Sequence, residues 1–188
     1  MVVTMANFRI FPAIALTFLL SACSSLPDQL ASNNENLITD YGQWISLDAN
    51  KDTELRLGGM IANVTNLEDK TRIEIANMPI KSNGKPNLDS EPDGRFVVYF
   101  DGYLEPMKYS EGRLITVLGN SAGEEQGKVG EYDYTYRVMD ASAAYLWTIE
   151  ESVIVDDYGS YMYPCLNRIN CRSMRMNVSR GRVVQEVK

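Results

Sequence analysis

The thiol of Cys23 is the side chain with the most specific chemistry in this sequence, because of the three residues in front of it. Leu20, Ser21 and Ala22 precede the cysteine. A thiol can take up a diacylglyceryl group as a thioether. The small Ser21 and Ala22 fit a peptidase active site, and Leu20 can fill an apolar subsite. The tetrapeptide therefore predicts cleavage before Cys23 and lipid attachment to its thiol. A chance cysteine behind an ordinary cleavage site is the alternative.

The segment in front of Cys23 has the parts of a secretory signal peptide. Arg9 is its only charged residue, and residues 10–20 form an apolar run interrupted by Pro12 and Thr17. This run is too short to cross a bilayer core of about 30 Å as a helix. We therefore expect residues 1–22 to be a cleaved signal peptide.

The sequence Leu-Ser-Ala-Cys resembles the lipobox of bacterial lipoproteins, in which the cysteine becomes the first residue of the mature chain. The resemblance implies three acyl chains on Cys23, and stable anchoring requires more than one chain. Ser24 and Ser25 follow, and neither is the aspartate that favours inner-membrane retention in enteric lipoproteins. By this analogy the protein is anchored in outer membrane lipid through acylated Cys23 and faces the periplasm.

Two further cysteines, Cys165 and Cys171, are six residues apart. An exported chain is in an oxidising compartment, where paired thiols form disulfides. If Cys23 carries lipid, the two remaining cysteines allow one intramolecular pairing, and we expect a structural Cys165–Cys171 disulfide on a surface loop. A reduced pair and an intermolecular bridge stay open as alternatives.

The composition limits the possible functions. The sequence has 188 residues, no histidine and a formal net charge of −7. An acidic chain repels phosphate backbones, so no nucleic-acid partner is expected. Histidine is the commonest general base and metal ligand, and its absence predicts no metal site, no cofactor and no enzyme activity. Paired carboxylates of the glycosidase type stay open, because only their separation in space defines them.

A polar N-terminal stretch is followed by short strands that are separated by turn residues. Residues 23–45 are interpreted as the lipidated N-terminus and a flexible tether, with a short helix near 37–44. Residues 46–188 form the predicted barrel domain, with strands at 55–64, 71–76, 95–100, 112–119 and 132–139. Prolines and glycines predict loops at 77–94 and 120–130. The expected fold is all-β, a small five-stranded barrel of the OB type with extra C-terminal strands at 153–155 and 182–187.

Three tyrosines alternate along the last of these strands. Tyr132, Tyr134 and Tyr136 would lie on one face, because successive side chains of a strand point to opposite sides. Such a row of rings can stack on sugars, bases or aromatic side chains, and it is the best candidate for a binding face. The alternative is that the three rings are half-buried barrel residues, since tyrosine is generally favoured in strands.

Several short motifs occur in a fixed order between residues 56 and 147. They are Arg56-Leu57-Gly58-Gly59-Met60-Ile61-Ala62, Thr71-Arg72-Ile73-Glu74-Ile75-Ala76, Gly94-Arg95-Phe96, Asp101-Gly102-Tyr103-Leu104-Glu105-Pro106, Gly112-Arg113-Leu114-Ile115-Thr116-Val117-Leu118-Gly119, Gly127-Lys128-Val129-Gly130-Glu131-Tyr132 and Tyr145-Leu146-Trp147. In this order they resemble the Slp family of outer-membrane lipoproteins, the starvation-inducible lipoproteins of Gram-negative bacteria. The resemblance implies an outer-membrane address and supplies no catalytic residue. The Cys165–Cys171 pair departs from the Gly-, Trp- and Tyr-rich tail of that family.

The sequence therefore predicts a non-enzymatic lipoprotein of the cell envelope. We expect it to act in stress or in stationary phase by binding a periplasmic or membrane partner. A periplasmic hydrolase that uses carboxylates, or a protein that binds a small ligand such as a carbohydrate, is the alternative. A concave cluster of buried acids would favour the hydrolase, whereas a filled barrel with an exposed aromatic strip would favour the binding protein.

Overall fold

The computed structural model describes residues 25–49, 51–155 and 181–188 of the chain. The predicted lipidation motif (Leu20, Ser21, Ala22 and Cys23) and the predicted Cys165–Cys171 disulfide lie outside these described residues. Within them, no helix is long and apolar enough to cross a bilayer.

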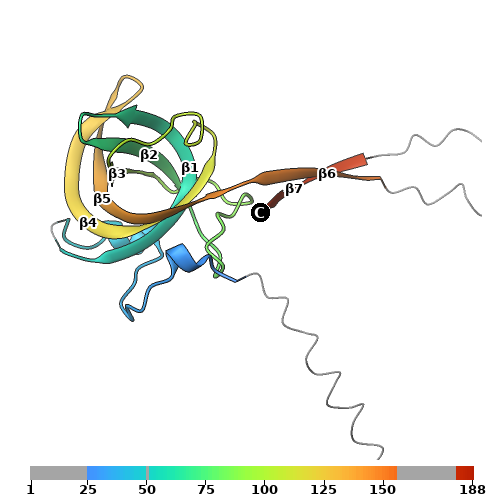
Figure 1. Cartoon of the computed structure of the whole chain (residues 1–188), viewed down its shortest axis with the longest axis horizontal. Helices are drawn as coiled ribbons and strands as arrows, with labels where there is room; N and C mark the ends of the chain where they lie inside the picture. Colours follow the sequence, from blue (N-terminus) through green and yellow to red (C-terminus); the bar gives the residue numbers. More distant parts are fainter. Residues whose placement is uncertain (1–24, 50, 156–180) are drawn as a thin grey trace, which may run out of the picture.

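Five strands close into a barrel with the neighbour order β1-β2-β3-β5-β4 (Figure 1). They are β1 (Glu54–Asn66), β2 (Lys70–Met78), β3 (Arg95–Asp101), β4 (Leu114–Val129) and β5 (Tyr132–Trp147). All neighbouring pairs are antiparallel except β3 and β5, which run parallel and close the barrel through register partners such as Phe96 and Arg137. The prediction of an all-β protein is thus confirmed.

The barrel interior is filled by apolar side chains from all five strands. The buried cluster includes Leu55, Leu57, Ile61, Ile73, Ile75, Phe96, Val98, Ile115, Val117 and Met139. Two of the glycines in β1 let the strands approach closely: a Cβ on Gly59 would lie 2.0 Å from the carbonyl oxygen of Ala76. The interior is therefore a packed core.

The predicted loop at 120–130 is wrong, because β4 continues through these residues to Val129. Gly119 is a point of register shift in the pairing with β5, and a second shift separates Ser121 from Glu124. Gly123 and Gly130 both have positive φ, of 93° and 61°. These glycines mark bulges and a tight turn, and bulges bend a strand without ending it. β4 and β5 consequently form a long hairpin that extends beyond the barrel rim.

Residues 26–45 pack on the barrel, which corrects the prediction of a flexible tether for this part of the range 23–45. The backbone of Ile38 pairs with Leu55 of β1, and Arg56 Nη1 donates a hydrogen bond of 3.1 Å to the carbonyl oxygen of Leu30. The helix α2 (Tyr41–Ile45) is capped by the Asp40 side chain. It places Trp44, only 1% exposed, in the barrel core. The polar composition of this stretch predicted a tether, but its few apolar side chains, such as Leu30 and Trp44, decide the packing.

A second apolar cluster lies on the outside of the barrel, where the N-terminal segment meets the C-terminal strands. It contains Leu30, of the short 3-10 helix η2 (Asp28–Leu30), and also Met78, Leu114, Leu118, Trp147 and Val187. The strands β6 (Ile149–Val155) and β7 (Gly181–Val187) pair with each other as a separate two-stranded sheet, and do not extend the edge of the barrel. Figure 1 shows this ribbon leaving the barrel.

Candidate functional site

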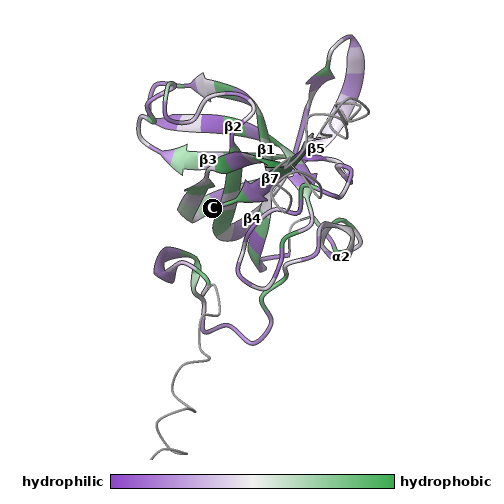
Figure 2. Cartoon of the chain, turned by 90° about the vertical axis from the view of Figure 1, so that its right-hand side faces the viewer, coloured by the Kyte–Doolittle hydropathy of each residue, from purple (hydrophilic) through white to green (hydrophobic). Residues whose placement is uncertain are grey.

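The tip of the β4–β5 hairpin is the part of the barrel that projects furthest from η2 (Figures 1 and 2). Gly130 and Glu131 form the turn between the two strands. The Tyr132 side chain is 81% exposed, and Glu131 and Asp133 beside it are also exposed. An exposed ring between two carboxylates can insert into a partner pocket that has a basic rim.

The three tyrosines of the predicted binding face have very different surroundings. Tyr136 is only 1% exposed, and its hydroxyl donates a hydrogen bond of 2.9 Å to the carbonyl oxygen of Lys128. Tyr134 is half-buried; its ring centroid lies 4.7 Å from that of Tyr136, and its hydroxyl accepts a 3.2 Å hydrogen bond from the backbone N–H of Arg95. Of the three predicted rings, only that of Tyr132 is fully accessible, whereas the rings of Tyr134 and Tyr136 pack against each other.

A network of ion pairs lies between the hairpin and strands β2 and β3. Arg72 of β2 and Glu125 of β4 form a 2.6 Å ion pair, and the Tyr99 hydroxyl donates a 2.6 Å hydrogen bond to the other oxygen of Glu125. A second pair joins Glu74 to Arg95 at 2.6 Å. The hairpin is therefore fixed at Glu125, whereas its tip at residues 130–133 is exposed.

This network was not predicted from the sequence. The signal that could have indicated it is the position of Arg72 and Glu74 on the polar face of their strand, opposite Ile73 and Ile75. Glu74 is only 6% exposed, although a polar face is normally solvated. Glu74 can be buried only if another element packs over it, and the folded hairpin does so with Tyr136.

The network also changes the acidity of the tyrosine hydroxyls. Burial, together with the nearby Glu74 carboxylate, raises the pKa of Tyr136 above the ordinary tyrosine value. Burial and the hydrogen bond to Glu125 likewise raise the pKa of Tyr99. Tyr41 of α2, which packs in the core and interacts with Tyr134, has its pKa raised mainly by burial. All three hydroxyls are therefore protonated at neutral pH and act as neutral donors.

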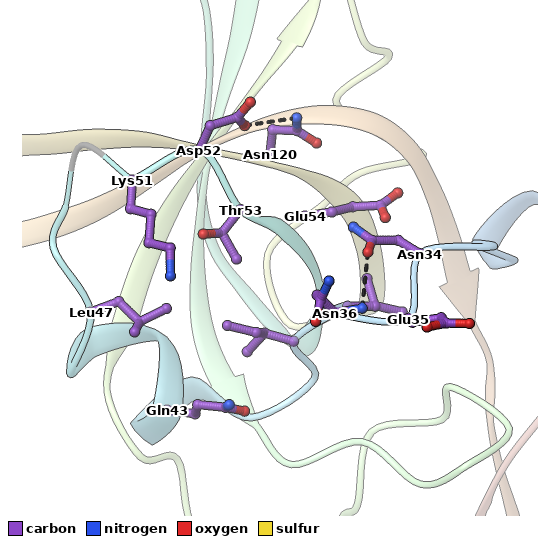
Figure 3. A pocket seen from close by; sticks show the side chains of 12 residues that line it. Asn34, Glu35, Asn36, Gln43, Leu47, Lys51, Asp52, Thr53, Glu54 and Asn120 are labelled. Carbon is purple, nitrogen blue, oxygen red and sulfur yellow. Dashed lines mark hydrogen bonds between the residues drawn. The ribbon is translucent and has the colours of Figure 1, made fainter.

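A polar groove of about 940 Å³ opens on a different side, between the N-terminal segment, α2 and the start of β1 (Figure 3). Its lining consists mainly of amide and charged side chains: Asn34, Glu35, Asn36, Leu37, Ile38, Gln43, Leu47, Lys51, Asp52, Thr53, Glu54 and Asn120. Asn120 donates a 3.1 Å hydrogen bond to Asp52 on one wall, and the backbone N–H of Asn36 donates to the Asn34 side chain on another. The groove could bind a polar ligand through its amides.

The carboxylates do not form the buried cluster that a hydrolase of the glycosidase type would need. Glu74 is the one buried acid among the described residues, and it is paired with Arg95 on the outer face of the sheet. In the groove, the Glu54 carboxylate accepts a 2.7 Å hydrogen bond from Ser32. No group of three His, Cys, Asp or Glu side chains in the described part of the chain could hold a metal ion.

Comparison with known proteins places the chain in a sequence family. The model of the Outer membrane lipoprotein Slp family matches residues 20–175. An uncharacterised protein of Haemophilus influenzae is 39% identical over 137 residues, which are 72% of this chain and 74% of that protein. The Outer membrane protein Slp of Escherichia coli K12 is 29% identical over 148 residues, covering 74% of this chain and 75% of its own. The uncharacterised lipoprotein YeaY of the same organism is 31% identical over 138 residues, covering 73% and 71%.

One solved structure is similar to part of the chain. It is the mitochondrial single-stranded DNA binding protein Rim1 of S. cerevisiae, which is 16% identical and covers 51% of this chain and 95% of its own. The TM-score of 0.33 is too low to support any statement about fold or function.

Proposed function

Because the chain belongs to the Outer membrane lipoprotein Slp family, and is thus a lipoprotein of the outer membrane, we propose that it acts there by binding a periplasmic protein partner through the tip of the β4–β5 hairpin. In this proposal the protein is not an enzyme. Acylated Cys23 holds it in the membrane, and the hairpin tip, defined as residues 130–133, is the recognition element.

The exposure of Tyr132 on a braced hairpin is the observation that carries this proposal. Its ring is 81% exposed, whereas Tyr136 below it is buried and Glu125 is fixed by Arg72 and Tyr99. A pre-ordered hairpin loses little conformational entropy on binding, so an exposed aromatic side chain there can contribute most of its burial energy to affinity. The flanking acids Glu131 and Asp133 favour a partner with basic residues around the pocket.

Site-specific photo-cross-linking in cells tests the proposed tip. A photo-reactive amino acid at position 132 is expected to capture one defined partner, and the same amino acid at Tyr103 is the matched control. Tyr103 is also an exposed tyrosine, at 67%, but lies in the connection between β3 and β4. Equal capture at both positions would contradict recognition by the hairpin tip.

Charge reversal distinguishes specific recognition from chance capture. Glu131→Lys with Asp133→Lys should abolish the cross-link from position 132, because the basic rim of the partner would then be repelled. Far-UV circular dichroism and the melting temperature should stay near wild type, since both side chains are exposed and away from the network. A cross-link that persists in the double variant would show that the negative charges of Glu131 and Asp133 do not contribute to binding of the partner.

The anchor is tested separately. Cys23→Ala should abolish labelling by palmitate and stop lipoprotein-type processing, because no other residue near the cleavage site offers a thiol. A variant that still incorporates palmitate and fractionates with the outer membrane would refute acylation at Cys23.

A role in stress or stationary phase would appear as reduced survival of a deletion strain in prolonged stationary phase. Survival should be restored by the wild-type protein but not by the hairpin variants.

The polar groove supports a second candidate function, the binding of a small carbohydrate-like ligand. The amides of Asn34, Asn36 and Asn120 can donate and accept hydrogen bonds to hydroxyl groups. Titration with peptidoglycan fragments, followed by nuclear magnetic resonance of the side-chain amides, tests this function. Shifts that are confined to the groove and lost in Asn36→Ala would support it, and unshifted groove amides would exclude these fragments as ligands.

A further inference from the structure

The turn at residues 81–85, between β2 and β3, is fixed to the outside of the barrel by hydrogen bonds. Within the turn, the backbone N–H of Lys81 donates to the carbonyl oxygen of Lys85 at 2.9 Å, and that of Gly84 donates back to Lys81 at 2.8 Å. The buried hydroxyl of Thr116 donates a 2.6 Å hydrogen bond to the carbonyl oxygen of Gly84. The turn is therefore a rigid part of the surface.

Leu26, close to the start of the described chain, packs directly on this turn. A Cβ on Gly84 would lie 2.8 Å from Leu26 Cδ1 and 3.5 Å from Leu30 Cδ1. Gly84 has a φ of 81°, so glycine is suited both to the left-handed backbone and to this close contact. The N-terminal segment thus reaches the barrel at the turn, and it is held there by the apolar cluster around Leu30 and Trp147.

Chain length limits the distance between the predicted lipid attachment site and this turn. Cys23 is three residues before Leu26, and three extended residues span at most about 11 Å. A lipid anchor on Cys23 therefore cannot lift the barrel far from the bilayer. The surface around residues 81–85 contacts Leu26, which is three residues after the predicted lipid attachment site.

Two lysines flank this contact, and neither forms an ion pair within the described part of the chain. Lys81 is exposed; Lys85 is half-buried, with its ammonium 5.9 Å from the ring centroid of Trp147. Asp89 and Glu186 line the same shallow depression of about 310 Å³ beside the turn. The two ammonium groups are therefore open to an anionic partner, beside the two acids of the depression.

We propose that the turn at residues 81–85 docks on the bilayer, with Lys81 and Lys85 binding the phosphate groups of anionic phospholipids around the anchor. The proposal rests on the acylation of Cys23 proposed above. A negative membrane surface attracts basic groups within a Debye length and repels the acidic remainder of the barrel. The lipid anchor and the two lysines together would fix the orientation of the barrel on the membrane. The β4–β5 hairpin lies on the side of the barrel away from η2 (Figure 1) and would then point into the periplasm.

Lipid cross-linking from two positions of the acylated protein tests this orientation. The full-length lipoprotein, purified from outer membranes, is added to vesicles of phosphatidylethanolamine and phosphatidylglycerol that contain a tagged phospholipid. A photo-reactive amino acid replaces Ser82, exposed in the turn, or Asp133, exposed at the hairpin tip. We expect lipid adducts from position 82 and several-fold fewer from position 133. Equal adducts from both positions would overturn the proposal.

Charge reversal then tests the two lysines. Lys81→Glu with Lys85→Glu should lower the lipid adducts from position 82 several-fold in these vesicles. The loss should be small in vesicles of phosphatidylcholine, which carry no net charge. Lys108→Glu with Lys128→Glu is the matched control, because both side chains are exposed and lie elsewhere on the barrel. Unchanged adducts after reversal at 81 and 85, or an equal loss in the control, would refute lysine-mediated docking.

Failure of docking and failure of the anchor give different results. The mass of the N-terminal peptide reports acylation of Cys23 independently of any lipid adduct. An acylated protein without adducts from position 82 would refute docking and leave the anchor intact. A protein without acyl chains at Cys23 would refute both. Far-UV circular dichroism of each charge variant establishes that a loss of adducts reflects the changed charge and not unfolding.

Discussion

Arg72 on β2 and Glu125 on β4 form an ion pair of 2.6 Å between residues that are 53 positions apart in the chain. The guanidinium also lies over the Tyr136 ring, 5.4 Å from its centroid, and Tyr99 shares the carboxylate. The two side chains are only 19% and 25% exposed, so solvent screens the pair less than at an open surface. The contact connects the hairpin to a face of the barrel with which β4 has no strand pairing.

Removal of the Glu125 carboxylate should therefore loosen the hairpin. Glu125→Ala leaves Arg72 and the Tyr99 hydroxyl without their acceptor, and we expect a loss of about 1.5–3 kcal/mol in the free energy of unfolding. Urea denaturation measures this loss, and amide hydrogen exchange should show faster opening of residues 124–137. Glu131→Ala, at the exposed tip, is the control and should change stability by less than about 0.5 kcal/mol. Unchanged exchange in the hairpin would mean that strand pairing alone holds it.

The packing of the N-terminal segment leads to a second prediction. Trp44 is 1% exposed and makes edge-to-face contacts with Tyr41 and Phe96, with centroids 6.1 and 5.9 Å apart. Trp44→Ala should cost about 3–5 kcal/mol, as expected for a large aromatic side chain removed from a core. Ile45→Ala, one residue later and 46% exposed, should cost less than about 1 kcal/mol. Thermal or urea unfolding measures both. Equal small losses would restore the interpretation of residues 23–45 as a free tether.

The raised tyrosine pKa values predict a loss of stability at alkaline pH. The pKa of Tyr136 and that of Tyr99 are higher in the folded protein than the ordinary value of about 10. The folded state thus holds these protons more tightly than the unfolded chain. The stability from this source is fully present below about pH 10 and decreases as the pH rises through the folded-state values.

Denaturation at a series of pH values from neutral to alkaline measures this dependence. Tyr136→Phe should weaken the decrease in stability above about pH 10, because one of the shifted hydroxyls is gone. Absorbance of tyrosinate in the folded protein should show groups that ionise late. A wild-type protein whose unfolding free energy is the same at neutral and strongly alkaline pH would contradict the prediction.

The cysteines predicted to pair supply a fourth test. Mass mapping of the unreduced mature protein should show Cys165 joined to Cys171, because both are exported and Cys23 carries lipid in our proposal. The bridge would close a short loop, so Cys165→Ser with Cys171→Ser should lower stability by about 2–3 kcal/mol and leave localisation unchanged. Free thiols at both positions in protein isolated from the periplasm would disprove the pairing.

The sequence alone was sufficient for the local strand pattern. Ile73 and Ile75 alternate with Arg72 and Glu74, and a two-residue period is imposed by the backbone of any strand. The strands at 71–76 and 95–100 accordingly lie within β2 and β3. The predicted lipidation motif at Cys23 is equally local, because it consists of four consecutive residues, and it stays a prediction. Family membership followed from the order of short motifs and is shown by the match over residues 20–175.

Only the tertiary structure decided which side chains of these strands are accessible. Tyr132, Tyr134 and Tyr136 alternate identically in the sequence, yet the first is 81% exposed and the last 1%. The difference arises because Tyr136 directly precedes the point where β5 joins β3, from Arg137 onward, whereas Tyr132 lies next to the hairpin turn. Likewise, the polar residues around Leu30 and Trp44 predict a tether. In the structure, Leu30 belongs to the same apolar cluster as Trp147, and Trp44 to the same cluster as Phe96, both far along the chain. Burial depends on such long-range contacts, and a local pattern does not contain them.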